Sequence, residues 1–89
     1  MKLYLNDEIN WETLETGETL IFDPVTSCSF LCNEEATAIM TLCTGKEEDV
    51  IVKEYVDNVG NVDVPLDAIQ EGARRFLKEL LHKRVIIRK

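Results

Sequence analysis

Three cysteines and one histidine are the side chains of this 89-residue chain best suited to metal or redox chemistry. Cys28 and Cys32 are close in sequence, whereas Cys43 and His82 lie far from them. A structural zinc site needs converging thiolate or imidazole ligands, usually from a turn that wraps the ion. Cys28 and Cys32 are instead expected on one face of a strand. We therefore predict no metal site, and expect all three cysteines to behave as small buried hydrophobic residues.

Nucleophilic catalysis requires a base beside a serine or cysteine, and His82 is the one imidazole in the chain. It falls on the polar side of an expected C-terminal helix, where solvent or the helix dipole explains it better. The carboxylates are scattered over loops and helix starts, and the sequence has no glycine-rich phosphate-binding loop. The sequence therefore predicts no catalytic residue, no cofactor and no enzyme.

Charge is distributed unevenly along the chain, whose net charge is −7. Residues 1–70 hold three basic and fifteen acidic residues, whereas residues 71–89 hold seven basic and two acidic ones. This asymmetry can attract an acidic partner to the C-terminal segment, although a solvated helix face explains it equally well. Because DNA binding requires neutralisation of phosphates, which an acidic surface opposes, nucleic acid is not the expected partner.

The composition, 45% hydrophobic and 30% charged, is typical of a globular protein. No apolar run approaches the roughly 20 residues that cross a membrane, and the start MKLYLNDEIN is too polar for a signal peptide. An odd number of cysteines favours reduced thiols. We expect a single domain over residues 1–89 that is cytoplasmic and has no membrane partner.

Three short strands are predicted in the first third of the chain. Residues 9–14 alternate with the period of two of a half-buried strand, and a turn at 16–18 leads to a second strand over 19–23. Pro24 ends that strand because proline cannot donate to a ladder. A third strand is expected over 27–32, which completes an antiparallel meander.

Three helices are predicted after the strands. Asn33 is a suitable N-cap for the first, and a second is expected over 47–55, followed by a loop over 56–64. Pro65 opens the third helix, which extends to about Lys83. The predicted apolar stripes comprise Ala36, Ile39, Met40 and Cys43 on the first helix, and Leu66, Ile69, Ala73, Phe76, Leu77 and Leu80 on the third.

The predicted order of elements is therefore βββααα. This is an α+β fold of the winged helix-turn-helix-like kind, with a three-stranded antiparallel sheet followed by three helices. Residues 85–89 could extend the last helix or form a short strand, and the sequence does not decide between these.

The third predicted strand has the properties of an edge that accepts another strand. Residues 27–33 contain no charged side chain and no proline, the devices that usually blunt sheet edges. The backbone around Phe30 is therefore expected to have open hydrogen-bonding capacity, which an extended peptide can use. Phe76 and Arg75 would form the opposite, cationic helical wall. Gly72 would either open space in that groove or permit close helix packing.

The run FLCNEEATAIMTLCTGK at 30–46 resembles the signature of PqqD-like proteins, the recognition elements for precursors of ribosomally synthesised and post-translationally modified peptides (RiPPs). That signature has an aromatic strand ending in asparagine, an E-x-A-x-x-I helix and a glycine. Upstream, LIFDPVTSCSF resembles their strand-turn-strand, and downstream VDVPLDAIQEGARRFLKELLHKRVI resembles their final helix. The resemblance covers residues 18–87. Three residues depart from the pattern, with Cys32, Thr44 and Arg84 standing where leucine, aspartate and glycine are usual.

This resemblance implies a non-catalytic protein that captures the leader of a precursor peptide as an added β-strand between the third strand and the third helix. It also implies delivery of the peptide to a modifying enzyme, which in the PqqD case is a radical S-adenosylmethionine protein. The implied peptide-binding residues are Ser27, Cys28, Ser29, Phe30, Leu31, Gly72, Arg75, Phe76 and Glu79. A winged-helix DNA-binding or regulatory domain, and a homodimer formed by edge pairing, remain open as alternatives.

Overall fold

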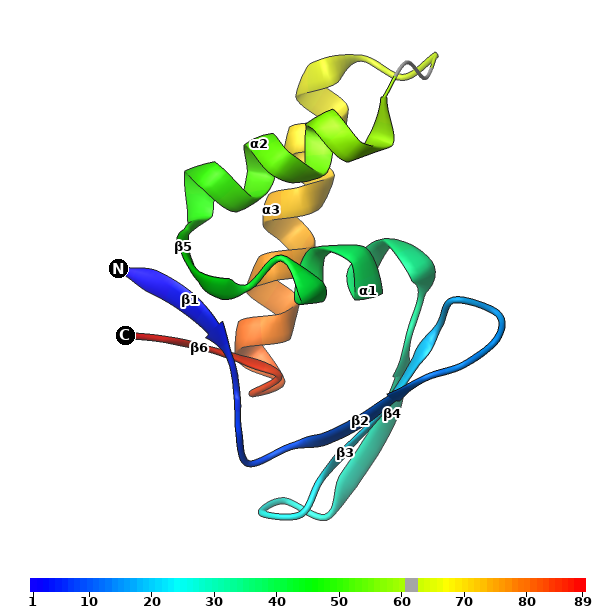
Figure 1. Ribbon diagram of the computed structural model, residues 1–89, viewed down its shortest axis with the longest axis vertical. Helices are drawn as coiled ribbons and strands as arrows, with labels where there is room; N and C mark the ends of the chain where they lie inside the picture. The colour runs from blue at the N-terminus through cyan, green and yellow to red at the C-terminus, as the bar shows by residue number, and fades with distance from the viewer. Residues whose placement is uncertain (61–62) are drawn as a thin grey trace.

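The computed structural model describes residues 1–60 and 63–89, in which strands precede and follow three helices (Figure 1). Four strands come first, namely β1 (Lys2–Leu5), β2 (Asn10–Thr13), β3 (Thr19–Asp23) and β4 (Cys28–Cys32). The rest of the chain forms α1 (Glu34–Thr41), β5 (Thr44–Glu47), α2 (Glu48–Val59), α3 (Leu66–His82) and β6 (Ile86–Arg88). Within these residues, no helix combines the length and the apolar character that crossing a membrane requires.

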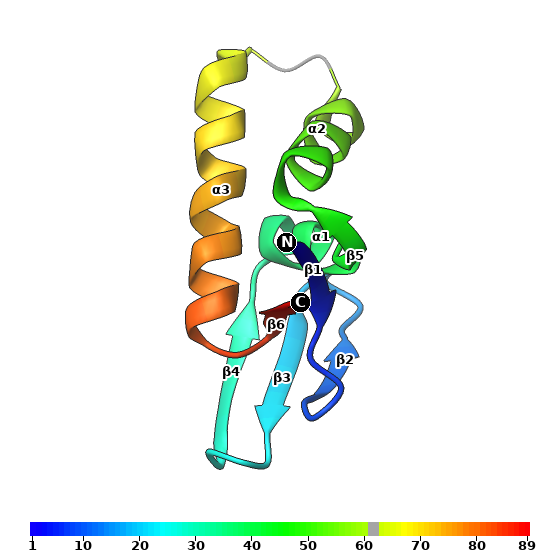
Figure 2. The ribbon, with the colours of Figure 1, turned by 90° about the vertical axis from the view of Figure 1, so that its left-hand side faces the viewer.

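The strands form two separate three-stranded antiparallel sheets. One has the order β2-β3-β4 and is the predicted meander, whereas the other has the order β5-β1-β6 and joins the two ends of the chain. In Figure 2, α3 runs along one side of the molecule, with α1 and α2 beside it and the β2-β3-β4 sheet extending below them. The α+β class and the order of a three-stranded sheet followed by three helices are confirmed. The winged-helix likeness stays a prediction.

The second sheet was not predicted from the sequence. It answers the question left open for residues 85–89, because β6 pairs with β1. Gly45 belongs to β5, and its φ of 92° needs glycine. A Cβ at this position would lie 2.8 Å from the ring of Tyr4, so close contact between β5 and β1 also depends on it.

The predicted helices are confirmed with changes at their ends. Asn33 caps α1 through its side chain, which accepts a 2.8 Å hydrogen bond from the Ala36 N–H. Helix α1 ends at Thr41, so Cys43 is buried just beyond the helix and not on it. Helix α2 continues past 55 to Val59, which shortens the predicted loop over 56–64. Residues 61 and 62 of that loop lie outside the described part.

The core lies where the helices meet both sheets, and most of the predicted apolar stripes are confirmed. Ile21, Ile39 and Leu77 have no exposed surface, and the Thr37 hydroxyl donates a buried 2.9 Å hydrogen bond to the Thr19 hydroxyl. Leu66 was wrongly placed in the core, because it is the first residue of α3 and is 54% exposed. The prediction that all three cysteines are buried was also wrong. Cys28 is exposed, because it begins β4 at the hairpin end of the sheet.

Arg84 connects the end of α3 to the β3–β4 hairpin. Its φ of 65° lies in the left-handed region that favours glycine. Even so, its guanidinium Nε donates a 3.2 Å hydrogen bond to Asp23 Oδ2, and its backbone carbonyl accepts a 2.8 Å hydrogen bond from the Asn6 side chain. The side chain of Asp23 is only 2% exposed. Arg84, which stands where glycine is usual in the PqqD-like pattern, therefore pairs with a carboxylate that is almost fully buried.

The pKa of Asp23 reflects this environment. Burial of the carboxyl opposes its ionisation, but the backbone N–H of Val25 and the Arg84 guanidinium together outweigh burial and hold the pKa below its ordinary value of 3.8. A carboxyl whose pKa is lower in the folded than in the unfolded chain stabilises the folded state at pH values above the unfolded-state pKa. That contribution is lost as pH falls through the folded-state pKa.

We expect Arg84→Gly to lower the melting temperature at pH 7. The change relieves about 1 kcal/mol of backbone strain, but leaves the covered Asp23 carboxylate without its cation. The difference in melting temperature from wild type should narrow as pH falls below 3.8 and through the lower folded-state pKa of Asp23, where the carboxyl becomes protonated. Thermal unfolding followed by circular dichroism from pH 7 to pH 2 measures both effects. Arg84→Lys, which keeps a cation, is the matched control, and an Arg84→Gly chain more stable than wild type at pH 7 would contradict the assignment.

Candidate functional site

Strand β4 has an open edge, as the sequence predicted. In the β2-β3-β4 sheet, β3 is paired on both sides whereas β4 is paired with β3 alone. Ser29 and Leu31 are exposed and Phe30 is half-buried. The uncharged segment is therefore free along one side to accept hydrogen bonds from, and donate them to, another extended chain.

The register determines which backbone groups of β4 face this open side. Partners in an antiparallel ladder alternate between pairs that exchange both hydrogen bonds and pairs that exchange none. Asp23 is opposite Cys28, and Pro24, the next residue, has no N–H to bridge the hairpin. Asp23 and Cys28 must therefore be a hydrogen-bonded pair. The β2–β3 hairpin leads to the same assignment. The Leu14 N–H donates to the Glu18 carbonyl at 2.7 Å, so Glu18 directs its backbone to β2 and every second residue of β3 from Thr19 onward directs its backbone to β4.

Alternation along an uninterrupted register then assigns the rest of β4. Phe30 and Cys32 direct their backbone groups to β3, where they face Ile21 and Thr19. The N–H and C=O groups of Ser29 and Leu31 point to the open side. The open hydrogen-bonding capacity expected around Phe30 is therefore present, but it belongs to the residues on either side of Phe30.

Three cavities follow one another along α3, and together they are called the groove here. Two of them lie between α3 and β4, whereas the third lies between α3, α2 and the start of α1. The central cavity has a volume of about 110 Å³ and is lined by Leu31, Cys32, Asn33, Ala36, Phe76, Glu79, Leu80 and Lys83. The hairpin cavity, of about 420 Å³, is lined by Asp23, Thr26, Cys28, Phe30, His82, Lys83 and Arg84. The helix cavity, of about 390 Å³, is lined by Glu35, Tyr55, Val59, Val64, Ala68, Ile69, Gly72, Ala73 and Phe76. Lys83 lines the first two cavities and Phe76 lines the first and third, so neighbouring cavities adjoin at these two side chains.

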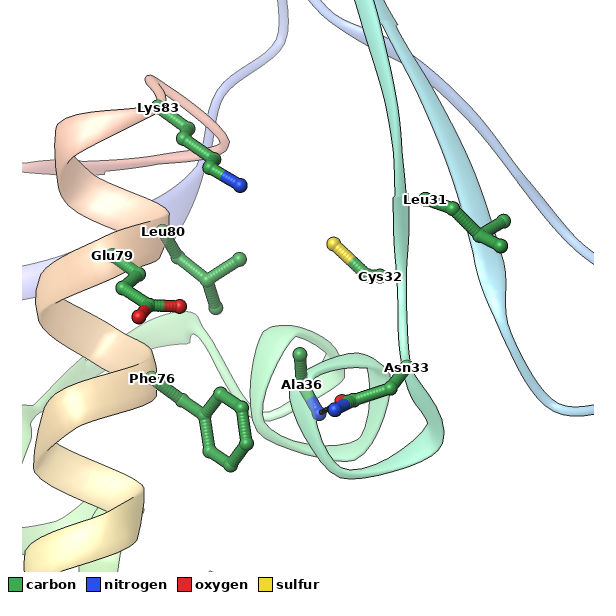
Figure 3. A pocket seen from close by; sticks show the side chains of 8 residues that line it. All are labelled: Leu31, Cys32, Asn33, Ala36, Phe76, Glu79, Leu80 and Lys83. Carbon is green, nitrogen blue, oxygen red and sulfur yellow. Dashed lines mark hydrogen bonds between the residues drawn. The ribbon is translucent and has the colours of Figure 1, made fainter.

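The close view of the central cavity shows how its walls are formed (Figure 3). The Cys32 sulfur points across the gap towards α3, the Lys83 ammonium points from α3 towards β4, and the Leu31 side chain points away. The Lys83 Nζ lies 4.7 Å from the centre of the Phe30 ring, within the range of a cation–π contact. Lys83 therefore spans the groove at the boundary between the central and hairpin cavities.

Positive charge at the groove is concentrated near the C-terminal end of α3. Two cations, Lys83 and Arg84, line the hairpin cavity. Arg75 is exposed and lines none of the three cavities of the groove, and Arg74 is held by Glu48 and Asp49 at 2.6 and 2.9 Å. The negative side chains at the groove are Asp23, which lines the hairpin cavity and pairs with Arg84, Glu79 in the central cavity and Glu35 in the helix cavity.

The residues implied by the family resemblance gather around this groove, with exceptions. Ser27 lies in the hairpin turn with a φ of 59° and is not part of β4, while Arg75 lies outside the cavities. The others lie at the open edge (Ser29) or line a cavity (Cys28, Phe30, Leu31, Gly72, Phe76 and Glu79). Sequence reasoning missed Lys83, although its spacing of seven from Phe76 and four from Glu79 places the three on one helix face.

Gly72 opens space and does not allow close helix packing. Apart from its chain neighbours and the backbone of its own helix, a Cβ built on Gly72 would have no described atom within 4 Å. Of the two roles that the sequence left open for this residue, the packing role is therefore wrong. The missing side chain forms part of the helix cavity instead.

The cysteines have no arrangement suited to catalysis or metal binding in the described part of the chain. Among residues 1–60 and 63–89, no group of three His, Cys, Asp or Glu side chains could hold a metal ion. Burial raises the pKa of the Cys32 thiol, against a smaller opposing effect of Lys83, and burial raises the pKa of Cys43 to about 12. Both thiols are therefore protonated at neutral pH and are poor nucleophiles.

Comparison with known proteins gives a match in fold. No protein-family model and no curated protein matches the chain. A solved structure of TbiB1 in complex with the TbiA(beta) leader peptide is similar, with a TM-score of 0.73 and 21% sequence identity. The match covers 97% of this chain and 94% of that chain. The two chains therefore share their overall fold.

We expect Gly72→Ala to raise the free energy of unfolding by about 0.5–1 kcal/mol, because alanine is the better helix former and its methyl group enters open space. Urea denaturation of the two proteins measures the difference. Ala68→Gly, a reverse change on the exposed side of the same helix, should lower stability by a similar amount. A destabilised Gly72→Ala chain would mean that the position is packed.

We expect alkylation to distinguish the three cysteines. Under native conditions iodoacetamide should modify the exposed Cys28 first, whereas the buried Cys32 and Cys43 should react only after unfolding. Mass spectrometry of peptides from a time course gives the order. The same reaction in urea, in which all three thiols are accessible, is the control. Native modification of Cys43 at the rate of Cys28 would contradict its burial.

Proposed function

We propose that this chain is a non-catalytic binding protein that captures the leader of a ribosomally synthesised precursor peptide. In this proposal the leader adds a strand to β4, opposite α3, and the complex is presented to a modifying enzyme. The observation that supports it most is an uncharged strand edge, open at Ser29 and Leu31, that borders a groove walled by α3. The shared fold with TbiB1, a protein solved with a leader peptide, supports the same proposal.

Backbone pairing alone does not provide enough affinity. Ser29 and Leu31 each offer one N–H and one C=O, and each net hydrogen bond contributes about 0.5–1.5 kcal/mol. Their sum, about 2–6 kcal/mol, falls at or below the roughly 4–15 kcal/mol that association costs in lost freedom. Side chains of the peptide must therefore bury apolar surface or form ion pairs in the groove, which is the role we assign to the cavities.

The charges at the groove favour an acidic peptide segment at one end. Lys83 reaches over β4 beside Phe30, whereas Arg84 in the same cavity is already paired with Asp23. Because this cavity is partly enclosed, an ion pair formed there is screened less than one on an open surface. We infer that an acidic side chain of the leader lies next to Lys83.

The proposal makes residues 1–89 one PqqD-like peptide-recognition domain that acts in the cytoplasm, where precursor peptides are translated. It assigns the chemistry to a partner enzyme, and a radical S-adenosylmethionine protein is the kind of partner that the family resemblance suggests. Two cations on or just after α3 already form ion pairs, Arg74 with Glu48 and Asp49, and Arg84 with Asp23. This engagement, with a net charge of −7, makes DNA binding the weaker alternative.

A library of random peptides displayed on phage tests the proposal without knowledge of the natural precursor. Selected peptides should perturb the backbone amide resonances of Ser29 and Leu31 when they are added to the isotope-labelled protein. Duplex DNA should not bind the protein with a steep salt dependence, and it should not displace the selected peptides from the protein. Failure to enrich any peptide, or perturbations confined to the β5-β1-β6 sheet, would count against the proposal.

We expect Ser29→Pro to weaken binding of a selected peptide by at least about tenfold, because proline removes one donor on the open side and the ring obstructs the incoming strand. Ser29→Ala keeps the donor and should bind like wild type. Isothermal titration calorimetry gives the affinities, and circular dichroism checks the fold. If Ser29→Pro does not fold, Leu31→Pro serves the same purpose, since its N–H also points away from β3. Equal affinity of a folded proline variant and wild type would be the contrary result.

A further inference from the structure

We infer that the helix cavity is a second anchoring site for the same peptide, and that it takes one bulky apolar side chain from the segment adjoining the strand paired with β4. This inference rests on the proposed function and extends it from the sheet edge to the α2–α3 interface. The site is defined by the open space at Gly72 and by Tyr55, Val59, Ile69 and Phe76.

The absence of a side chain at Gly72 is what makes the cavity available. Glycine inside an exposed helix face weakens the helix relative to alanine. Here no neighbouring helix uses the space, since no described atom of another element lies within 4 Å of the position that a Cβ would take. The surrounding side chains are predominantly apolar. Ile69, Val59 and Phe76 are only partly buried, so the described chain leaves apolar surface accessible at this point.

The path of the groove identifies the occupant. Strand β4 ends at Cys32 and α1 begins at Glu34, so a peptide that leaves the open edge at this end passes the central cavity beside Asn33 and Ala36. The Phe76 ring lines both the central and the helix cavities. Because the two cavities adjoin at Phe76, an extension of the same peptide is the occupant that we assign to the helix cavity.

The electrostatics of the cavity also limit its occupant. Glu35 lines the cavity from the start of α1, and burial together with this carboxylate raises the pKa of Tyr55. The cavity therefore offers a protonated phenol and an apolar surface beside a carboxylate, which disfavours an acidic side chain. The groove then discriminates at two points, with an acidic residue preferred near Lys83 and a leucine- or phenylalanine-like residue preferred near Gly72.

Peptides selected from the displayed library against the wild-type chain provide the test. They should share one large apolar position in addition to an acidic one. Replacing that apolar residue by alanine should weaken binding to wild type by at least about tenfold, the loss expected when a large apolar side chain no longer becomes buried. A set of peptides with no such position would overturn the inference.

Gly72→Leu fills the cavity and completes a double-mutant cycle. It should weaken binding of the selected peptide by about as much as the peptide's own alanine replacement, and the two changes together should cost little more than either alone. Glu71→Leu, which adds the same side chain one position away and outside the groove, should have no effect. If Gly72→Leu does not fold, Gly72→Ala replaces it in the test. This variant keeps the helix intact, and it should weaken peptide binding by less than Gly72→Leu would.

The outcomes distinguish this inference from the proposed function. If peptides are selected and shift the Ser29 and Leu31 amides, but bind Gly72→Leu and wild type equally, the second anchor is wrong and strand addition stands. If no peptide is selected, or none perturbs β4, the proposed function itself fails. Independent, additive losses in the double-mutant cycle would also overturn the assignment of the apolar residue to the helix cavity.

Discussion

The pairing of β4 with a single neighbour is the constraint on which the other features of the site depend. Strand β3 is fixed from both sides and covered by the core at Ile21, so it determines both the position and the hydrogen-bonding phase of β4. Pro24 sets that phase, because it cannot bridge the hairpin. Arg84, which reaches from the end of α3 to Asp23, holds the same hairpin from outside.

Stability and recognition use adjoining faces of α3. Ala73, Leu77 and Leu80 are buried, and two of them, Ala73 and Leu80, also line cavities of the groove. The less buried Gly72, Phe76 and Glu79, with Lys83 at the end of the helix, border the same groove. The groove thereby combines a main-chain edge that accepts any extended sequence with side-chain cavities that differ in charge and depth. The edge supplies orientation, and the cavities supply most of what distinguishes one ligand from another.

Local patterns predicted the meander, the Asn33 cap and the α3 core face, because alternation, capping and helical spacing are properties of neighbouring residues. The β5-β1-β6 sheet gave no such signal, since its strands are short and Lys2 bonds to Lys89 at the far end of the chain. At the site, an uncharged strand and a mid-helix glycine were sufficient to find the edge and Gly72. Counting charges indicated a basic helix, but it could not say that Lys83 crosses the groove while Arg75 lines none of its cavities.

The division of α3 into a packed and an open face has a consequence for divergence. Substitutions on the groove side touch few core contacts, so they can alter ligand preference while leaving folding nearly unchanged. The β4 edge binds through backbone hydrogen bonds, so it continues to accept a ligand whose side chains have changed. When the sequence of the ligand changes during evolution, single replacements at a few positions of α3 can restore binding. The same positions are where orthogonal pairs of protein and ligand can be engineered.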